Sequence, residues 1–247
     1  MTGPTSIHRG PAKGGGDVSE TARGLVLAAI LAALAGMVDV IGYLHLKGLF
    51  ISFMSGNSTQ LAAALGGGDL NGAATIAELI TLFVLGAAGG QVLADFTGRW
   101  HMTWVLIGVA ILLVIAAGLE TASQPMVFAM GALDATMRRA GSIPISLTFV
   151  TGVLVRFGQG LGDFLTRRVT GWNWLVQGTP WLGLITGATI GSAVYMRMGE
   201  GAIWVPIGVA ALLAAYSGGY TAARLIHRAP RCLPRVPRQR QAAASDN

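Results

Sequence analysis

Charged side chains that could bind a ligand or carry a proton interrupt the apolar stretches of this sequence at only a few positions. These side chains are Asp39, Glu78, Asp134, Arg156 and Asp163. A charged group inside a bilayer is costly, so each one is a functional candidate. Asp39 in "GMVD" and Asp134 in "GALD" share a local context. Two such carboxylates could bind a cation or carry a proton; alternatively, each binds an arginine or caps a broken helix.

A run of small and polar residues, Ser-Gly-Asn-Ser-Thr-Gln, lies inside the apolar stretch "FISFMSGNSTQLAAAL" at residues 50–65. Ser55, Asn57 and Thr59 offer hydroxyl and amide groups, and Gly56 permits close approach of a backbone or a ligand. A helix that begins here would present free N–H groups to an anion. The run therefore predicts a solute-binding segment. The alternative is a kinked helix whose hydroxyls bond its own backbone or a neighbouring helix.

A comparable segment is "SLTFVTG" at residues 146–152, and its Thr151 lies at the start of another predicted helix. Arg156 lies just beyond it. This arginine could hold an anionic solute through two hydrogen bonds. It could equally be the structural partner of Asp39 or Asp134, because an unpaired buried charge is costly. We expect Asn57, Arg156 and both aspartates to meet in one polar pocket near the middle of the membrane, with Arg156 bonded to one carboxylate.

The composition is that of a protein embedded in a membrane. The 247 residues are 53% hydrophobic and 11% charged, whereas soluble domains carry about 25% charged residues. The mean hydropathy is +0.60, and the apolar runs approach the ~20 residues that a helix needs to cross a bilayer. Glycine accounts for 36 residues, and small residues let membrane helices approach closely.

Catalytic and cofactor sites are not expected. With one cysteine, Cys232, neither an internal disulfide nor a Cys-rich metal site can form. The sequence has no metalloprotease, P-loop, dinucleotide-binding or hydrolase nucleophile motif. Its basic tail lacks the interleaved aromatics of a nucleic-acid binder, so anionic lipid is the simpler partner. We therefore predict no cofactor, no metal, no catalytic residue and no nucleic-acid partner.

Eight apolar segments follow one another along the chain. They cover residues 23–46, 49–66, 73–97, 102–119, 123–139, 145–166, 178–198 and 202–222. Several fall short of the ~20 residues that a full span requires. We therefore predict an all-α integral membrane protein with six to eight transmembrane or re-entrant helices.

Matching motifs recur about 100 residues apart, in the same order. "WVLIGVAILL" at Trp104 matches "WVPIGVAALL" at Trp204. The matched glycines are Gly36 with Gly131, Gly56 with Gly152, Gly86 with Gly187 and Gly90 with Gly191. These matches predict two repeated halves, 23–122 and 123–222, between a disordered N-terminal tail (1–22) and a basic C-terminal tail (223–247). Halves with three spans and a re-entrant piece would be inverted, and halves with four spans would be parallel.

Two stretches of the sequence resemble a known family. "AGMVDVIGYL" followed by "GLFISFMSGNS" is similar to the first signature of the YoaK-like bacterial integral membrane proteins, defined by domain of unknown function 1275. "MGALDATMRRAGSIPISLTFVTG" is similar to the second signature, and it departs from the family at Asp134, where Asn is usual. The resemblance covers about residues 23–222. It implies a multi-pass bacterial inner-membrane protein and no particular substrate.

Taken together, the sequence predicts a small-solute transporter or permease with a polar site at the interface of its two halves. The predicted binding residues are Asp39, Ser55, Asn57, Thr59, Asp134, Thr151 and Arg156. The expected partners are the lipid bilayer and an unidentified small solute or ion, and assembly with identical copies stays open. The alternative is a non-transporting scaffold or a subunit of a larger complex, and a membrane-embedded enzyme ranks third.

Lys and Arg predict the orientation of the chain in the membrane. Both tails are rich in these residues, so both termini are expected in the cytoplasm. This holds for six spans as well as for eight. If all eight segments span, Lys47, Arg99, Arg138, Arg139 and Arg197 would lie outside.

Overall fold

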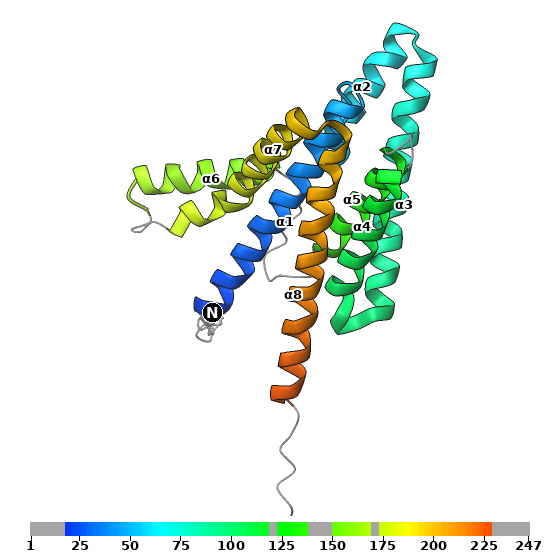
Figure 1. Cartoon of the computed structure of the whole chain (residues 1–247). Helices are drawn as coiled ribbons and strands as arrows, with labels where there is room; N and C mark the ends of the chain where they lie inside the picture. The colour runs from blue at the N-terminus through cyan, green and yellow to red at the C-terminus, as the bar shows by residue number, and fades with distance from the viewer. Residues whose placement is uncertain (1–17, 119–122, 138–149, 169–172, 229–247) are drawn as a thin grey trace, which may run out of the picture.

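The computed structural model describes residues 18–118, 123–137, 150–168 and 173–228, and within these ranges the chain is helical without strands. Figure 1 shows the helices. The α-helices are α1 (Val18–His45), α2 (Met54–Gly67), α3 (Leu70–Thr97), α4 (His101–Gly118), α5 (Ser123–Met137), α6 (Val150–Leu165), α7 (Thr179–Met198) and α8 (Trp204–Arg228). Three short 3-10 helices are η1 (Gly98–Trp100), η2 (Asn173–Gly178) and η3 (Gly199–Ile203).

Each predicted apolar segment corresponds to one α-helix, which confirms the all-α prediction for the described ranges. Two tail boundaries differ from the prediction. Helix α1 already begins at Val18, inside the predicted tail 1–22. Helix α8 continues to Arg228, six residues beyond the predicted boundary at 222. Helix α8 can continue because Thr221, Ala222 and Ala223 are compatible with a helix, and the next proline is Pro230.

Helix length and composition agree with a membrane protein. Three described stretches are long and apolar enough to cross a membrane on these two criteria: 26–45, 70–118 and 174–225. The second stretch contains α3 and α4, and the third contains α7 and α8. In both, the chain reverses at a glycine with positive φ, Gly98 (52°) and Gly199 (58°). Helix α2, at 14 residues, is only about 21 Å long and is too short to span the ~30 Å hydrocarbon core.

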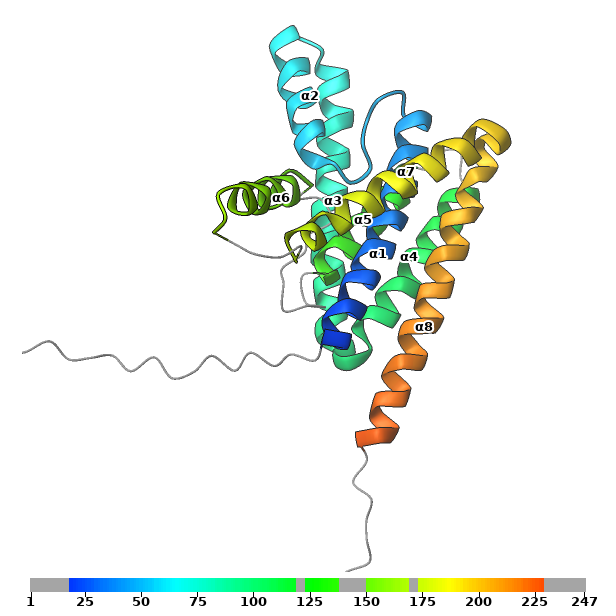
Figure 2. The same ribbon diagram turned by 90° about the vertical axis from the view of Figure 1, so that its left-hand side faces the viewer.

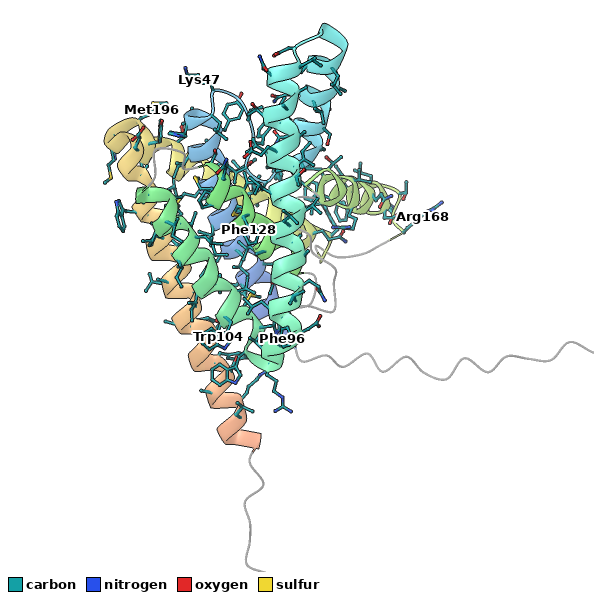
Figure 3. All side chains as sticks on the ribbon, turned by 90° about the vertical axis from the view of Figure 1, so that its right-hand side faces the viewer. Lys47, Phe96, Trp104, Phe128, Arg168 and Met196 are labelled. Carbon is teal, nitrogen blue, oxygen red and sulfur yellow. The ribbon has the colours of Figure 1, made fainter. Side chains whose placement is uncertain are left out.

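The long helices run in two opposite directions. Helices α1, α4 and α7 run away from the end of the bundle where the N-terminus is marked, and α3, α5 and α8 run towards it (Figures 1 and 2). Figure 3 shows Phe96 and Trp104 at that end, and Lys47 and Met196 at the opposite end. Both the start of α1 and the end of α8 therefore lie at the same end of the bundle.

Glycines bring two pairs of parallel helices into backbone contact. On α1, a Cβ at Gly36 would collide with the carbonyl oxygen of Leu184 on α7. On α5, a Cβ at Gly131 would collide with the carbonyl oxygen of Phe83 on α3. Because no side chain fits between these backbones, the helices pack at the closest possible spacing.

The reciprocal contacts have the same form. A Cβ at Gly187 of α7 would collide with the carbonyl of Ala33, and one at Gly86 of α3 would collide with that of Phe128. Ala33 and Phe128 are 95 positions apart, as are Gly36 and Gly131. Gly86 and Gly187 are 101 positions apart, as are Phe83 and Leu184. Helix α1 thus packs on α7 in the register in which α5 packs on α3.

The hydrophobic core lies where these pairs meet the antiparallel pair α4 and α8. Its fully buried side chains include Leu31, Leu34 and Val38 of α1, Val105, Leu106 and Val109 of α4, and Met130 and Leu133 of α5. Near the end that carries the termini, the hydroxyls of Thr103 on α4 and Ser217 on α8 are 2.9 Å apart and share a hydrogen bond. Helix α1 is therefore central, and polar atoms on its inner face need partners within the protein.

Candidate functional site

The chain between α1 and α2 turns back into the bundle, and we call residues 46–53 the inner loop. Lys47 and Gly48 have positive φ (51° and 113°), which reverses the chain after α1. Ile51 is then fully buried in the core, against Gly42, where a Cβ would collide with its side chain. Figure 2 shows the chain descending beside α1 before α2 rises. The inner loop thus places irregular backbone inside the bundle.

Asp39 holds the deepest part of the inner loop. Its side chain is 5% exposed, and its Oδ1 accepts hydrogen bonds from the backbone N–H groups of Ile51 and Ser52, both at 2.8 Å. Hydrogen bonds to an ionised acceptor are stronger than those between neutral groups. The carboxylate therefore supplies the acceptor that these two amides lack, because no neighbouring strand or helix turn pairs with them.

Asn57, in the first turn of α2, holds the adjacent residue of the loop. The side chain is fully buried. Its Oδ1 accepts from the Phe50 N–H at 3.0 Å, and its Nδ2 donates to the Phe50 carbonyl at 2.7 Å. Gln60, one turn further along α2, donates from Nε2 to the Gly48 carbonyl at 3.0 Å. Unpaired backbone groups are not tolerated at membrane depth, and these side chains satisfy those of the inner loop.

Glycine and aromatic residues complete the site. Phe50 packs against Tyr43 and Phe53, with ring centroids 4.9 and 5.8 Å apart. A Cβ at Gly56 would lie 2.9 Å from the Phe50 ring, so glycine at this position lets the ring sit on α2. The motifs "GMVD" and "SGN" therefore act together: their Asp39 and Asn57 side chains hold the inner loop between α1 and α2.

A known protein family matches most of the helical part of this chain. Residues 27–216 match the family described as "Protein of unknown function (DUF1275)". The chain belongs to the DUF1275 family. It is also 41% identical, over 198 residues, to the UPF0700 transmembrane protein RA0705 of Rhizobium meliloti (strain 1021), which covers 78% of this chain and 85% of the relative. No solved structure matches the chain. The family and the apolar helices together make this DUF1275 chain a membrane protein.

The other hydroxyls of this DUF1275 protein's polar run have a local role. Ser58 donates to the Met54 carbonyl at 2.7 Å, and Thr59 donates to the Ser55 carbonyl at 3.1 Å. Ser55, Ser58 and Thr59 are exposed on α2. Their oxygen atoms can still accept hydrogen bonds from a ligand. The run therefore divides into Asn57 and Gln60, which hold the loop, and exposed hydroxyls, which face away from it.

The second half of the DUF1275 chain distributes its predicted residues differently. Asp134 is buried on α5, and residues 138–149, which follow this helix, lie outside the described ranges. Thr151 and Arg156 are exposed on α6. A neighbouring face of α6 packs on Trp174 of η2 through Phe157 and Phe164, at ring distances of 5.1 and 5.9 Å.

We predicted that Arg156 would bond to one of the two aspartates, and in the described part of the chain Asp39 is not its partner. Helix α6 has apolar and polar faces, and its aromatic face turns to η2 while Arg156 turns outward. The Oδ1 atom of Asp39 accepts hydrogen bonds from two backbone amides instead. Asp39 and Asn57 do lie at one site, as predicted, but the inner loop joins them and Arg156 does not.

Two further predicted candidates also lie away from the inner loop. Glu78 on α3 is exposed and accepts a hydrogen bond from Gln124 of α5. Asp163 is exposed on α6. Over the described ranges, no group of three His, Cys, Asp or Glu side chains is placed to hold a metal ion. Phe50 was not among the predicted site residues, and Gln60 belonged to the predicted polar run but not to the predicted binding residues. An apolar side chain such as Phe50 carries no sequence signal for a role played by its backbone.

Proposed function

We propose that this DUF1275 protein is a small-solute transporter of the bacterial inner membrane. The observation that carries the proposal is the inner loop, a break in the helical run that lies inside the bundle and leads into the short helix α2. Transporters use such discontinuous helices to place polar groups near the middle of the membrane.

The proposal includes two inverted repeats. Helices α1, α3 and α4 correspond in order to α5, α7 and α8, and the members of each pair run in opposite directions. The matched glycine contacts support this correspondence, because α1–α7 and α5–α3 use the same register. Inverted repeats that exchange packing partners favour rocking of one pair of helices against the other, which is the common basis of alternating access.

Under this proposal, Asp39 and Asn57 position the inner loop, and the solute contacts other groups. The exposed hydroxyls of Ser55 and Thr59 lie on the helix that the loop leads into. Arg156 and Thr151 are the corresponding exposed groups on α6. A hydroxyl-rich surface suits a polar, hydrogen-bonding solute, and the single cationic side chain would favour one with an anionic group.

The proposed orientation has both termini in the cytoplasm. The end of the bundle that carries them also carries Arg99, which follows the end of α3, and Arg224 near the end of α8. A topology in which all eight segments span the membrane would instead place Arg99 outside. Lys47 and Arg197 lie at the opposite end, and Arg138 and Arg139 fall outside the described ranges. The basic side chains thus favour the terminal end as the cytoplasmic one.

A stabilisation screen followed by flux measurement tests the transporter proposal. Amino acids, sugars, nucleosides, carboxylates and inorganic ions would be added separately to the purified protein, and a bound solute should raise its melting temperature. The same solute should then enter proteoliposomes that contain the protein. Ser55→Ala with Thr59→Val should weaken uptake, and Thr75→Val on the exposed side of α3 should not. Absence of any solute effect, together with a stable co-purifying protein, would favour the scaffold alternative.

A further inference from the structure

An exposed stripe on α8 changes from apolar to aromatic to cationic along the helix. Its members are Leu212, Tyr216, Tyr220 and Arg224, spaced four residues apart. Residues at this spacing lie on one face of an α-helix. Leu212 is 73% exposed, Tyr216 60% and Tyr220 36%, and Arg224 is exposed as well. Leu212 and Tyr216 thus lie largely on the outer surface of the described helices.

The position of the stripe along α8 fits one leaflet of a bilayer. From Leu212 to Arg224 the helix rises about 18 Å. Half of the ~30 Å hydrocarbon core is about 15 Å. If Leu212 lies at the middle of the bilayer, the rise of about 18 Å places Arg224 in the headgroup region. At the other end of α8, Trp204 is exposed and lies about 30 Å from Arg224 along the helix. Tryptophan is enriched at membrane interfaces, so α8 alone marks both of them.

The polar end of the stripe is already ordered. The guanidinium carbon of Arg224 lies 4.7 Å from the centre of the Tyr220 ring. The Tyr220 ring is nearly parallel to that of Tyr216, with centroids 6.5 Å apart and an angle of 13° between the planes. A cation over an aromatic face is attracted to it by the ring's charge distribution. The guanidinium is therefore held beside the Tyr220 ring, close to the end of α8 where the headgroup region is expected.

We propose that this stripe binds a phospholipid with an anionic headgroup. Its acyl chain would lie along Leu212 and Tyr216, the tyrosine hydroxyls would face the glycerol region, and Arg224 would bind the phosphate. The guanidinium suits this role because it can donate two parallel hydrogen bonds to phosphate oxygens. Trp104 of α4 is exposed at the same end of the bundle (Figure 3), and the bond between Thr103 and Ser217 holds α4 beside the stripe.

The test compares lipid effects on the melting temperature of the purified full chain in detergent. Phosphatidylglycerol should raise it more than phosphatidylcholine does, and inorganic phosphate alone should not reproduce the difference. Arg224→Gln should remove at least half of the difference between the two lipids. Tyr220→Leu should remove part of it, which provides a second reading if the arginine variant folds poorly. Arg197→Gln, at the opposite end of the bundle, should leave the difference unchanged.

The tail provides a further control. Changing Arg231, Arg235, Arg238 and Arg240 together to Gln removes the attraction of the basic tail for anionic lipid, and this variant should keep more of the lipid difference than Arg224→Gln does. The proposal is overturned if the two lipids stabilise the native chain equally, or if inorganic phosphate reproduces the effect. It is also overturned if Arg224→Gln and Tyr220→Leu keep the full difference, or if the tail variant or Arg197→Gln loses as much of the difference as Arg224→Gln does.

Discussion

Asp39 and Asn57 are buried polar side chains whose hydrogen bonds go to backbone groups of the inner loop. Backbone amides that lack a helical or strand partner must find another one inside a membrane. Asp39 receives two of them on one oxygen atom, and Asn57 serves both the N–H and the carbonyl of Phe50. At this scale the conspicuous polar residues of the sequence are parts of a structural support.

Substitution of Asp39 should separate its hydrogen bonds from its charge. Asp39→Asn keeps an oxygen atom that can accept from Ile51 and Ser52, so we expect a loss of about 1 kcal/mol in unfolding free energy. Asp39→Leu leaves both amides without an acceptor and should cost about 2–5 kcal/mol. Denaturant or thermal unfolding in detergent measures both, with the exposed Asp163→Asn as the control. Equal losses for the two Asp39 variants would indicate that the charge, rather than the acceptor atom, matters.

Asn57 gives an independent test of the same support. Asn57→Ala should destabilise the protein by about 2–4 kcal/mol, because the Phe50 N–H and carbonyl then lack partners in a dry site. Ser58→Ala, at the next position but exposed, should have an effect below about 0.5 kcal/mol. Limited proteolysis should show faster cleavage within residues 46–53 for the Asn57 variant. An unchanged cleavage rate in that variant would mean that other contacts hold the loop.

Close helix pairs form the next level of organisation. Helices α1 and α7 touch through Gly36 and Gly187, and helices α3 and α5 touch through Gly86 and Gly131. Each contact joins one half of the chain to the other, so neither half can pack its first helix alone. The sequence predicted close approach of helices from its many small residues, and it matched these glycines between the two halves. The partners of the glycines were not predicted, because letter spacing indicates a small face but not the helix that it meets.

Alanine at these contacts should be far more harmful than alanine at other helical glycines. Gly187→Ala and Gly86→Ala each place a Cβ against a carbonyl of the facing backbone, and each should cost about 2 kcal/mol or more. Gly108 and Gly208 have nothing within 4 Å of the corresponding position. Gly108→Ala and Gly208→Ala should therefore be neutral or stabilise by up to about 1 kcal/mol. Melting temperatures of the four variants in one detergent make the comparison, and similar values would refute the close packing.

Much of the fold could be predicted from the sequence, because long apolar runs indicate membrane helices and glycines often mark the ends of helices. The ends of α3 and α7, for example, coincide with Gly98 and Gly199. The site followed only in part. Asp39 and Asn57 were found, yet their partners are backbone groups of residues 50–52, whose side chains carry no signal for this role. Arg156 is exposed on α6, whose aromatic residues pack on Trp174, and the sequence pattern of an amphipathic helix does not indicate which neighbour each of its faces will meet.

At the scale of the whole molecule, we propose that the two halves of the chain have inverted orientations in the membrane. The turns at Gly98 and Gly199 occupy corresponding places in the two halves. Between them lie α4, α5 and α7, which run in alternating directions, so the turns should face opposite sides of the membrane. Parallel halves with four spans each would instead place both turns on the same side.

Labelling of single cysteines from one side of the membrane tests this claim most directly. With Cys232→Ser as background, Arg99→Cys and Glu200→Cys would each be exposed to a membrane-impermeant maleimide in intact cells. We expect Glu200→Cys to react in intact cells, and Arg99→Cys to react only after the membrane is permeabilised. Labelling of both positions under the same condition would contradict inverted halves, and with them the proposed transport mechanism.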